Sequence, residues 1–391
     1  MGSAEDALWI ANPDGSGLRE IIKYRNNFDS SYPFSAGKKC LAYIDNDGGW
    51  YLNEIAIPEL TVRRITPLIS ENALALLQTQ YPEEDQDEYL PEADPLNLDF
   101  AFSRQGSLQW SHAGDILAFT GALDGFSTDL YFYHPASGEI EQMSAGSTQV
   151  ISILWSPDDR YVTYLGVPHL HEMTPYSSKG WVYDRQQGVN KAITRGEEAI
   201  RWLSDTRLLS YHYMDFCGNV NLTITDVQNA ASWPANPFES VFGVADMDPK
   251  TGALMFSIPE PWTTEDMCSP WKIHPETGIF LSTGGKVMKL ESITDREKDL
   301  EDIEIKWAPE ADVFVVSTYE QTVLVDTQGA VTAVIPVNGM KGIQWDADGQ
   351  TMYFFKTDHT QDLYMASTPS FQPVKITDGV YFEYFVFGWV T

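Results

Sequence analysis

The stretch ISILWSPDDRYVTYL, residues 151–165, decides the fold. Ile151 to Trp155 is largely apolar, Tyr161 to Leu165 has the same character, and both segments are predicted to be strands. Ser156-Pro157-Asp158-Asp159 lies between them. Proline fixes φ at the first corner of a turn, and aspartate can hydrogen-bond its own backbone across it. The stretch therefore predicts two antiparallel strands joined by a tight turn.

This unit recurs seven times with a period of about 45 residues, the spacing of four-stranded propeller blades. Each unit has a first strand, a tight turn, a second strand, a connection and a second hairpin. A tryptophan stands just before the tight turn in five of them, at Trp110, Trp155, Trp202, Trp307 and Trp345. A large aromatic residue at one phase of the repeat is typical of the wedge between radially arranged blades. The predicted fold is an all-β propeller of four-stranded antiparallel blades.

Residues at both ends of the chain lie outside the seven units. Asp6 to Lys23 reads as a hairpin, and Tyr381 to Val390 has strand character throughout. Joining the two would add a blade and remove the free edges of the ring. We therefore expect eight blades closed by N- and C-terminal strands, with seven blades as the alternative. The whole of 1–391 is expected to form one domain, with an acidic insertion at about 67–106 that begins with a helix over 70–80, capped by Ser70.

Several of these motifs are similar to those of a known repeat family. Trp-Ser-Pro-Asp-Asp-Arg-Tyr-Val at 155–162, Asn-Pro-Asp-Gly-Ser-Gly-Leu-Arg at 12–19 and Asp-Leu-Tyr at 129–131 resemble repeats of the TolB-like (WD40-like) β-propeller family. The resemblance covers the chain from Asp6 to Thr377 and implies the propeller fold. It implies little about activity, and the role of TolB itself is not carried over.

The composition limits the classes of partner. The 391 residues carry 56 acidic and 25 basic side chains, a formal net charge of -31. Such a chain repels a nucleic-acid backbone and an anionic membrane surface, whereas cations and basic proteins are compatible. No apolar run is long enough to span a bilayer. We expect a monomer. We also expect the protein to be exported to the periplasm or the cell exterior, or to be lipid-anchored, because Met1-Gly2-Ser3 is typical of a replaced leader.

The topology of a blade indicates where function would collect. Connections between second and third strands leave a blade at the same edge as connections between blades, and the tight turns leave at the other edge. We call the first of these edges the rim. Loops on a rigid scaffold tend to carry function, and the unusual residues of this chain fall in rim connections. The candidate binding residues are Asp124, Asp129, His169, His171, Glu172, Tyr176, His212, Asp215, Trp262, Glu265, Asp266, Asp358 and His359.

Two further features of the rim are candidates for metal binding. His169 and His171 would point the same way in an extended segment and, with Glu172 and His212, could hold zinc or another transition metal. Asp45-Asn46-Asp47-Gly48 resembles part of a calcium loop but lacks the distal glutamate, and a hairpin turn fits it better. No cofactor is otherwise expected.

Cysteine usage leaves one question open. Cys217 and Cys268 lie in equivalent connections of adjacent units and could form a disulfide on the rim, which would indicate an oxidising compartment. The alternative is two unpaired thiols. Three cysteines in the whole chain exclude a disulfide scaffold.

Catalysis has little support in the sequence, which contains no GxSxG, HExxH, P-loop or GxGxxG motif. The expected function is non-enzymatic binding of a ligand or protein through the rim. Aromatic residues beside carboxylates also suit sugars, so a carbohydrate-binding or glycosidase-like propeller is the alternative.

Overall fold

The structure is a computed structural model, and it describes a defined set of residue ranges. These are residues 6–10, 16–17, 19–24, 40–46, 49–57, 59–80, 107–125, 127–146, 148–167, 178–193, 198–213, 220–235, 245–258, 277–293, 303–308, 311–345, 349–356 and 362–376. The chain divides into two compact units, 1–206 with 386–391, and 207–385. Within the described ranges, no helix has both the length and the apolar character needed to cross a membrane.

The first unit contains fourteen of the described strands and one helix. They are β1 (Asp6–Ile10), β2 (Arg19–Tyr24), β3 (Cys40–Asn46), β4 (Trp50–Ala56), β5 (Thr61–Pro67), α1 (Glu71–Gln80), β6 (Leu108–Trp110), β7 (Leu117–Gly121), β8 (Asp129–His134), β9 (Glu139–Gln142), β10 (Gln149–Trp155), β11 (Tyr161–Val167), β12 (Lys179–Asp184), β13 (Val189–Ala192) and β14 (Glu198–Trp202).

The second unit contains the remaining described strands. They are β15 (Arg207–Tyr213), β16 (Val220–Asp226), β17 (Ala231–Pro234), β18 (Ala245–Met247), β19 (Leu254–Ile258), β20 (Gly278–Thr283), β21 (Lys286–Lys289), β22 (Glu304–Ala308), β23 (Val313–Ser317), β24 (Thr322–Asp326), β25 (Val331–Ile335), β26 (Met340–Trp345), β27 (Thr351–Lys356), β28 (Leu363–Ser367) and β29 (Val374–Lys375).

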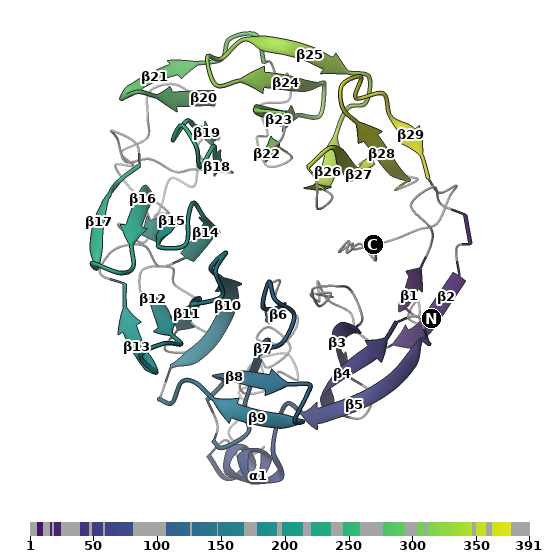
Figure 1. The fold of residues 1–391 in the computed structure, drawn as a ribbon, viewed down its shortest axis with the longest axis vertical. Coiled ribbons are helices and arrows are strands. Elements are labelled where there is room, and N and C mark those ends of the chain that lie inside the picture. Colours follow the sequence, from purple (N-terminus) through teal and green to yellow (C-terminus); the bar gives the residue numbers. More distant parts are fainter. Residues whose placement is uncertain are drawn as a thin grey trace, which may run out of the picture. The chain divides into compact units, whose positions relative to one another are not determined.

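The strands form small sheets in which the spatial order follows the chain order (Figure 1). Six described sheets have four strands, β6-β7-β8-β9, β10-β11-β12-β13, β14-β15-β16-β17, β18-β19-β20-β21, β22-β23-β24-β25 and β26-β27-β28-β29. The sheet β3-β4-β5 has three described strands and the hairpin β1-β2 has two. An all-β chain of consecutive up-and-down sheets is the arrangement of propeller blades, so this part of the fold prediction is confirmed.

The stretch that decided the fold behaves as predicted. β10 and β11 pair antiparallel, with Trp155 opposite Val162. The Ser156 hydroxyl accepts a hydrogen bond from the Tyr161 N–H and donates one to Asp158 across the turn. The five repeat tryptophans all lie at or next to the end of the first strand of a sheet, and four of them are buried. Their common phase in the sequence therefore reflects a common place in the blade.

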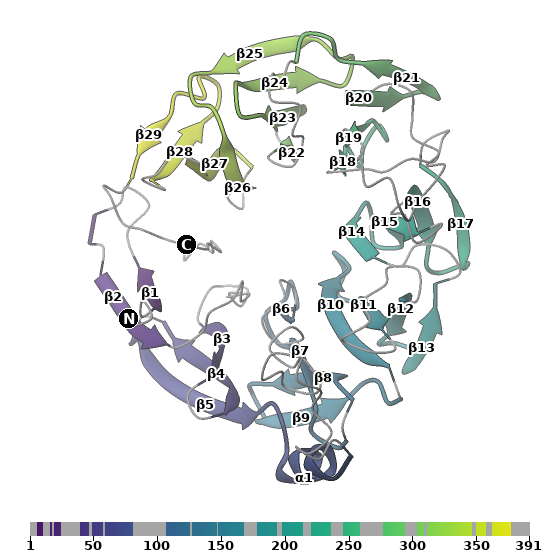
Figure 2. The ribbon, with the colours of Figure 1, turned by 180° about the vertical axis from the view of Figure 1, so that it is seen from behind.

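Neighbouring sheets within a unit pack through their faces. One apolar cluster of the first unit joins residues of β3–β4, β6–β8 and β10–β11, among them Leu52, Phe119 and Leu165. In the second unit, Val315, Met340 and Phe354 bring two sheets into another cluster. Figure 2 shows the first strands of these two sheets, β22 and β26, next to each other. The strands β7, β11 and β23 each contribute residues to two apolar clusters, so their sheets are buried on both faces, which explains the near-continuous burial of these second strands.

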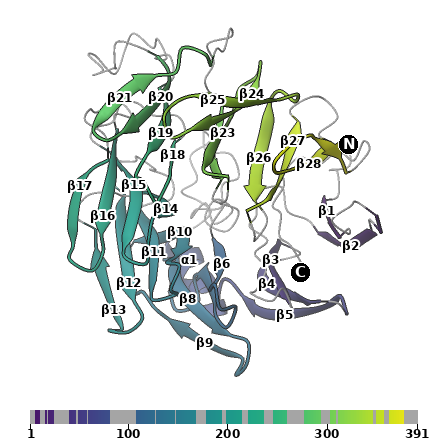
Figure 3. The ribbon, with the colours of Figure 1, turned by 45° about the horizontal axis from the view of Figure 1, so that its top comes forward.

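The helix predicted over 70–80 is present as α1 (Figure 3). Ser70 caps it, because its hydroxyl oxygen accepts a hydrogen bond of 3.0 Å from the Ala73 N–H. Before the cap, Ala122 donates to the Leu68 carbonyl and accepts from the Ser70 N–H, so the helix begins against the end of β7. The acidic part of the insertion, 81–106, lies outside the described residues.

Candidate functional site

Two of the predicted binding residues, Asp124 and Asp129, are joined by a shared hydrogen-bond donor. The Gln142 side-chain nitrogen donates to Asp124 Oδ2 at 2.8 Å and lies 3.4 Å from Asp129 Oδ2. The Tyr131 hydroxyl donates to Asp124 Oδ1 at 2.9 Å, and the Ser144 hydroxyl donates to Asp129 Oδ1 at 2.8 Å. We call Asp124, Asp129, Tyr131, Gln142 and Ser144 the β7–β8 cluster, after the connection that carries Asp124.

Local structure explains why these five side chains meet. Asp129 opens β8, and Tyr131 lies on the same face of that strand two residues later. Gln142 ends β9 and is the cross-strand partner of Tyr131. Ser144 follows β9, where its hydroxyl also accepts a hydrogen bond from the Leu130 N–H. The cluster is therefore fixed by strand register and does not depend on loop geometry alone.

The β7–β8 connection is tied to the connection between this sheet and the next. The Ser127 hydroxyl donates to the Gly146 carbonyl at 2.8 Å. Thr128 donates its N–H to the Gln149 side chain and its hydroxyl to the Val150 carbonyl. Blade topology predicts that these two connections share an edge, and in this sheet they do.

Burial separates the two carboxylates of the cluster. Asp129 is 2 % exposed, whereas Asp124 and Gln142 are exposed. Burial raises the pKa of Asp129 to about 6, against the hydrogen bond from Ser144, and the nearby Asp124 charge adds to the increase. Burial likewise raises the pKa of Tyr131, as does its bond to Asp124, so this phenol stays protonated. Asp124 is thus an exposed hydrogen-bond acceptor whose carboxylate is held in place by the Tyr131 hydroxyl and the Gln142 amide.

Of the other predicted site residues, the structure describes His212 alone. His212 is half-buried in β15, in the second unit, opposite Asn221. His169, His171, Glu172, Tyr176, Asp215, Trp262, Glu265, Asp266, Asp358 and His359 lie outside the described residues, as do Cys217 and Cys268. Among the side chains that the structure places, no three of the metal-binding types gather into a cluster. The disulfide hypothesis rests entirely on residues outside the described set, and the zinc hypothesis does so for every residue except His212.

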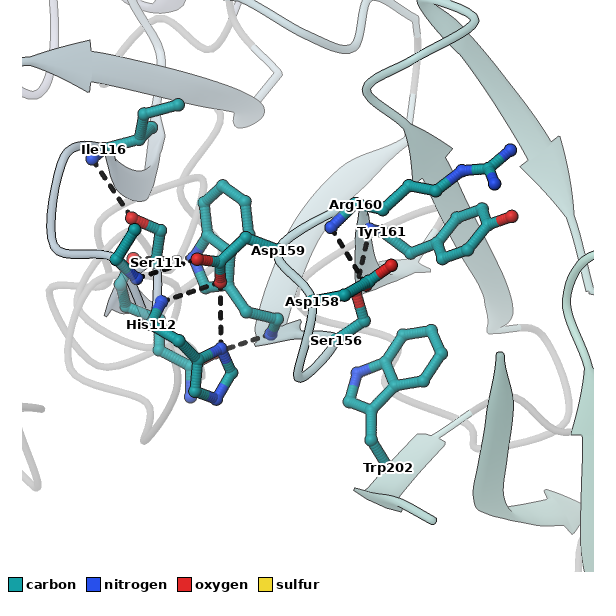
Figure 4. Close-up of polar contacts among 12 residues, drawn as sticks. Ser111, His112, Ile116, Ser156, Asp158, Asp159, Arg160, Tyr161 and Trp202 are labelled. Atoms are coloured by element: carbon teal, nitrogen blue, oxygen red, sulfur yellow. Dashed lines mark hydrogen bonds and ion pairs between the residues drawn. The ribbon is translucent and has the colours of Figure 1, made fainter. Parts of the chain in front are cut away.

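A second polar cluster lies at the tight turns and was not anticipated from the sequence (Figure 4). Asp159 accepts from the backbone N–H groups of His112, at 2.7 Å, and Ala113, at 2.8 Å. His112 Nδ1 lies 2.9 Å from the same carboxylate, which can only accept, so this ring nitrogen carries the hydrogen. Asp159 belongs to the turn after β10 and His112 to the turn after β6. The contact therefore joins equivalent turns of two neighbouring sheets.

The role of this second cluster is mainly structural. An aspartate that orients a histidine ring, with the ring 56 % exposed, is half of a general-base arrangement. However, the hydroxyls of Ser111 and Ser156, on the same two turns, are bonded to Asp115 and Asp158. Asp159 also satisfies two backbone donors that would otherwise lack a partner in the described structure. We therefore interpret it as a clasp between sheets.

Exposed aromatic surface occurs at one described rim connection that sequence reasoning overlooked. Tyr319, in the short turn between β23 and β24 of the second unit, is 56 % exposed. The turn is closed by hydrogen bonds between Thr318 and Gln321 in both directions. A lone tyrosine in a tight turn gives no sequence signal, because only the exposed fraction distinguishes it from core aromatics.

Similarity to known proteins is found at the level of solved structures. No family model matches the chain, and no curated protein matches its sequence. Solved β-propellers match it at low identity. TolB from Acinetobacter baumannii is 14% identical over 71% of this chain, with a TM-score of 0.36. An oligogalacturonate lyase from Vibrio parahaemolyticus is 14% identical over 69% of this chain and 76% of its own, with a TM-score of 0.43.

A third solved structure, the C-terminal WD40 domain of Sif2, is 11% identical over 89% of this chain and 83% of its own, with a TM-score of 0.49. The chain spans 57% of the length of the TolB structure. The chain is thus similar to TolB, WD40 and oligogalacturonate lyase propellers. These matches carry no conclusion about the function of this chain.

Proposed function

We propose that this chain is a non-enzymatic binding protein that receives a ligand or partner protein on the rim, with the β7–β8 cluster as one contact point. The observation that carries the proposal is the exposed Asp124 carboxylate, fixed by hydrogen bonds from Tyr131 and Gln142. A fixed acceptor loses little conformational entropy when it binds, which favours recognition.

The charge of the chain supports a cationic partner. The net charge of -31 attracts basic groups at long range, and an exposed carboxylate can form a charge-assisted hydrogen bond with a lysine or arginine side chain. We therefore propose that the partner is a basic segment of another protein. An exported location fits this proposal and is tested separately, by cell fractionation of the source organism.

The binding test compares two variants with the same change of charge. Fluorescence polarisation would measure the binding of a lysine-rich and a glutamate-rich peptide of equal length at physiological salt. We expect the lysine-rich peptide alone to bind, Asp124→Asn to weaken it about tenfold, and Glu139→Gln to leave it within about twofold. Glu139 is an exposed residue at the hairpin end of the same sheet. Equal loss in both variants, or no binding, would reject the proposal.

The glycan-binding alternative is favoured by one observation. Tyr319 offers an exposed aromatic face on a rigid turn, and such faces stack on sugar rings. Calorimetry with neutral, amino and uronic-acid oligosaccharides would test it. The control is Tyr364→Phe, since Tyr364 is a half-buried tyrosine of β28. Sugar binding that is lost in Tyr319→Ala and retained in the control would support this alternative over the first. Formation of shortened or unsaturated sugars on incubation would indicate a glycan-active enzyme instead.

We also propose that the sheets form one closed propeller of eight blades. Support comes from the two incomplete described sheets, since β1-β2 has two strands and β3-β4-β5 has three. Residues 381–390 have the composition of a further strand. Removal of residues 381–391 is expected to lower the unfolding temperature strongly, because it would leave open sheet edges. An unchanged unfolding temperature would argue for seven blades and a decorated terminus.

A further inference from the structure

The β7–β8 cluster contains a buried carboxylate that no described cation neutralises. Asp129 is 2 % exposed, and within the described part of the chain no lysine, arginine or histidine pairs with it. The side chains that hydrogen-bond to it, Ser144, Gln142 and Ser127, are all neutral. Burying an unpaired charge is costly, and a group in that position tends to exchange its charge for a proton.

We propose that Asp129 is a proton switch that sets the position of Gln142 and, through Gln142, the hydrogen bonding of the exposed Asp124. The inference needs no ligand and therefore stands apart from the proposed function. The geometry supports it because a single amide nitrogen serves both carboxylates.

The two oxygens of Asp129 differ in their contacts. Oδ1 accepts a short bond of 2.8 Å from Ser144, whereas Oδ2 accepts the longer bond of 3.4 Å from the Gln142 nitrogen. A proton from solvent is therefore expected on Oδ2. The new hydroxyl then faces another donor, since an amide NH₂ cannot accept a hydrogen bond. Gln142 can relieve this conflict by rotating its amide so that its oxygen accepts from Asp129, which takes its nitrogen away from Asp124.

The surroundings of Asp129 place this proton transfer near neutral pH. Burial is the main cause that raises its pKa to about 6, and the Asp124 charge adds to it, while hydrogen bonds from Ser144, Gln142 and Ser127 oppose it. Two tyrosines also interact electrostatically with Asp129. They are Tyr131 on β8 and Tyr164 on β11 of the next sheet. Burial raises the pKa of both phenols, so neither titrates in this range. The titrating group is therefore Asp129, with Asp124 as its charged neighbour.

Nuclear magnetic resonance can follow the switch in the free protein. Carbon-13 in the aspartate carboxyl groups and nitrogen-15 in the glutamine side chains would report Asp129 and Gln142 separately during a pH titration. We expect one carboxyl signal to titrate at about pH 6, and the Gln142 amide signal to shift with the same midpoint. Asp129→Asn should remove both transitions. Asp124→Asn should move the midpoint to lower pH, and the matched control Glu139→Gln should leave it in place.

Each outcome decides the proposal. Asp124 is exposed, so its variant reports on the switch even if Asp129→Asn fails to fold. The absence of any carboxyl transition between about pH 5 and pH 7 would overturn the assignment. A carboxyl transition at pH 6 with a Gln142 signal that stays constant would also overturn it, because Asp129 would then be a buried acid without a link to Asp124.

Discussion

Trp155 and Gln109 are joined by two hydrogen bonds between neighbouring sheets. The Trp155 indole N–H donates to the Gln109 carbonyl, and the Trp155 backbone N–H donates to the Gln109 side-chain oxygen, both at 2.9 Å. Similar links recur between other first strands. Trp202 donates its indole N–H to the Leu154 carbonyl, and Asp246 accepts from the backbone of Trp307. Trp155, Trp202 and Trp307 are thus buried residues that also hydrogen-bond to the neighbouring sheet.

Removal of the Gln109 side chain should therefore destabilise the first unit. Gln109→Ala leaves the buried backbone N–H of Trp155 without its acceptor, which is expected to cost about 1–3 kcal/mol in the free energy of unfolding. Urea denaturation followed by tryptophan fluorescence would measure it. Gln187→Ala, in an exposed turn, should change stability by less than about 0.5 kcal/mol. Equal stability of the two variants would show that the link contributes nothing.

The clasp between tight turns predicts a graded series at Asp159. This residue has φ of 57°, where glycine and asparagine fit but alanine is strained. We expect Asp159→Gly to lose about 1–3 kcal/mol from two unsatisfied backbone donors, and Asp159→Ala to lose about 1 kcal/mol more. Asp159→Asn should lose less than either. His112→Ala should lose under about 1 kcal/mol, because only an exposed ring contact disappears. Thermal unfolding of the four variants would rank them.

Asp184 should stabilise the protein only above acidic pH. Burial acts to raise its pKa, but hydrogen bonds from Arg160 and from the Gln187 and Gln186 N–H groups hold it below the ordinary 3.8. A carboxyl with a lowered folded-state pKa contributes stability above its unfolded pKa and loses it as pH falls through the folded value. Asp184→Asn should therefore be less stable than the unmodified protein at pH 7. The difference should shrink below about pH 4, as measured by calorimetry.

Asp129 should show the opposite dependence. Its folded-state pKa of about 6 exceeds the ordinary 3.8, so its contribution is fully present below 3.8 and is lost as pH rises through about 6. Asp129→Asn should become more stable relative to the unmodified protein as pH rises from about 4 to about 6. The same calorimetric series would detect it. A constant difference across this range would indicate that Asp129 keeps an ordinary pKa.

The cap of α1 gives a local prediction. Ser70→Ala removes the acceptor for the Ala73 N–H and should cost about 1 kcal/mol of helix stability. Ser70→Gly should cost only a few tenths of a kcal/mol, because glycine is tolerated at the N-cap position. Hydrogen exchange of the Ala73 amide would report this directly, since it should speed up about fivefold in Ser70→Ala. Unchanged exchange at Ala73 would show that the cap does not limit opening of the helix.

The sequence determined the blades because they are local. Strand, tight turn and strand are neighbours in the chain, so Trp155-Ser156-Pro157-Asp158 carries its own turn chemistry, and the repeat shows through the phase of five tryptophans. The start and cap of α1 were predictable for the same reason. Asp124 and Asp129 could be selected as rim residues from topology, but their shared bond to Gln142 could not, because it depends on register with β9.

Tertiary structure alone decided which polar residues are buried and what they touch. Asp129 and Asp184 look alike in the sequence, yet one is buried beside another carboxylate and the other beside Arg160, so their pKa values move in opposite directions. His112 and Asp159 are 47 positions apart and meet only because equivalent turns of adjacent sheets pack together. Electrostatic energy depends on distance through space and on burial, and neither is written in the local sequence.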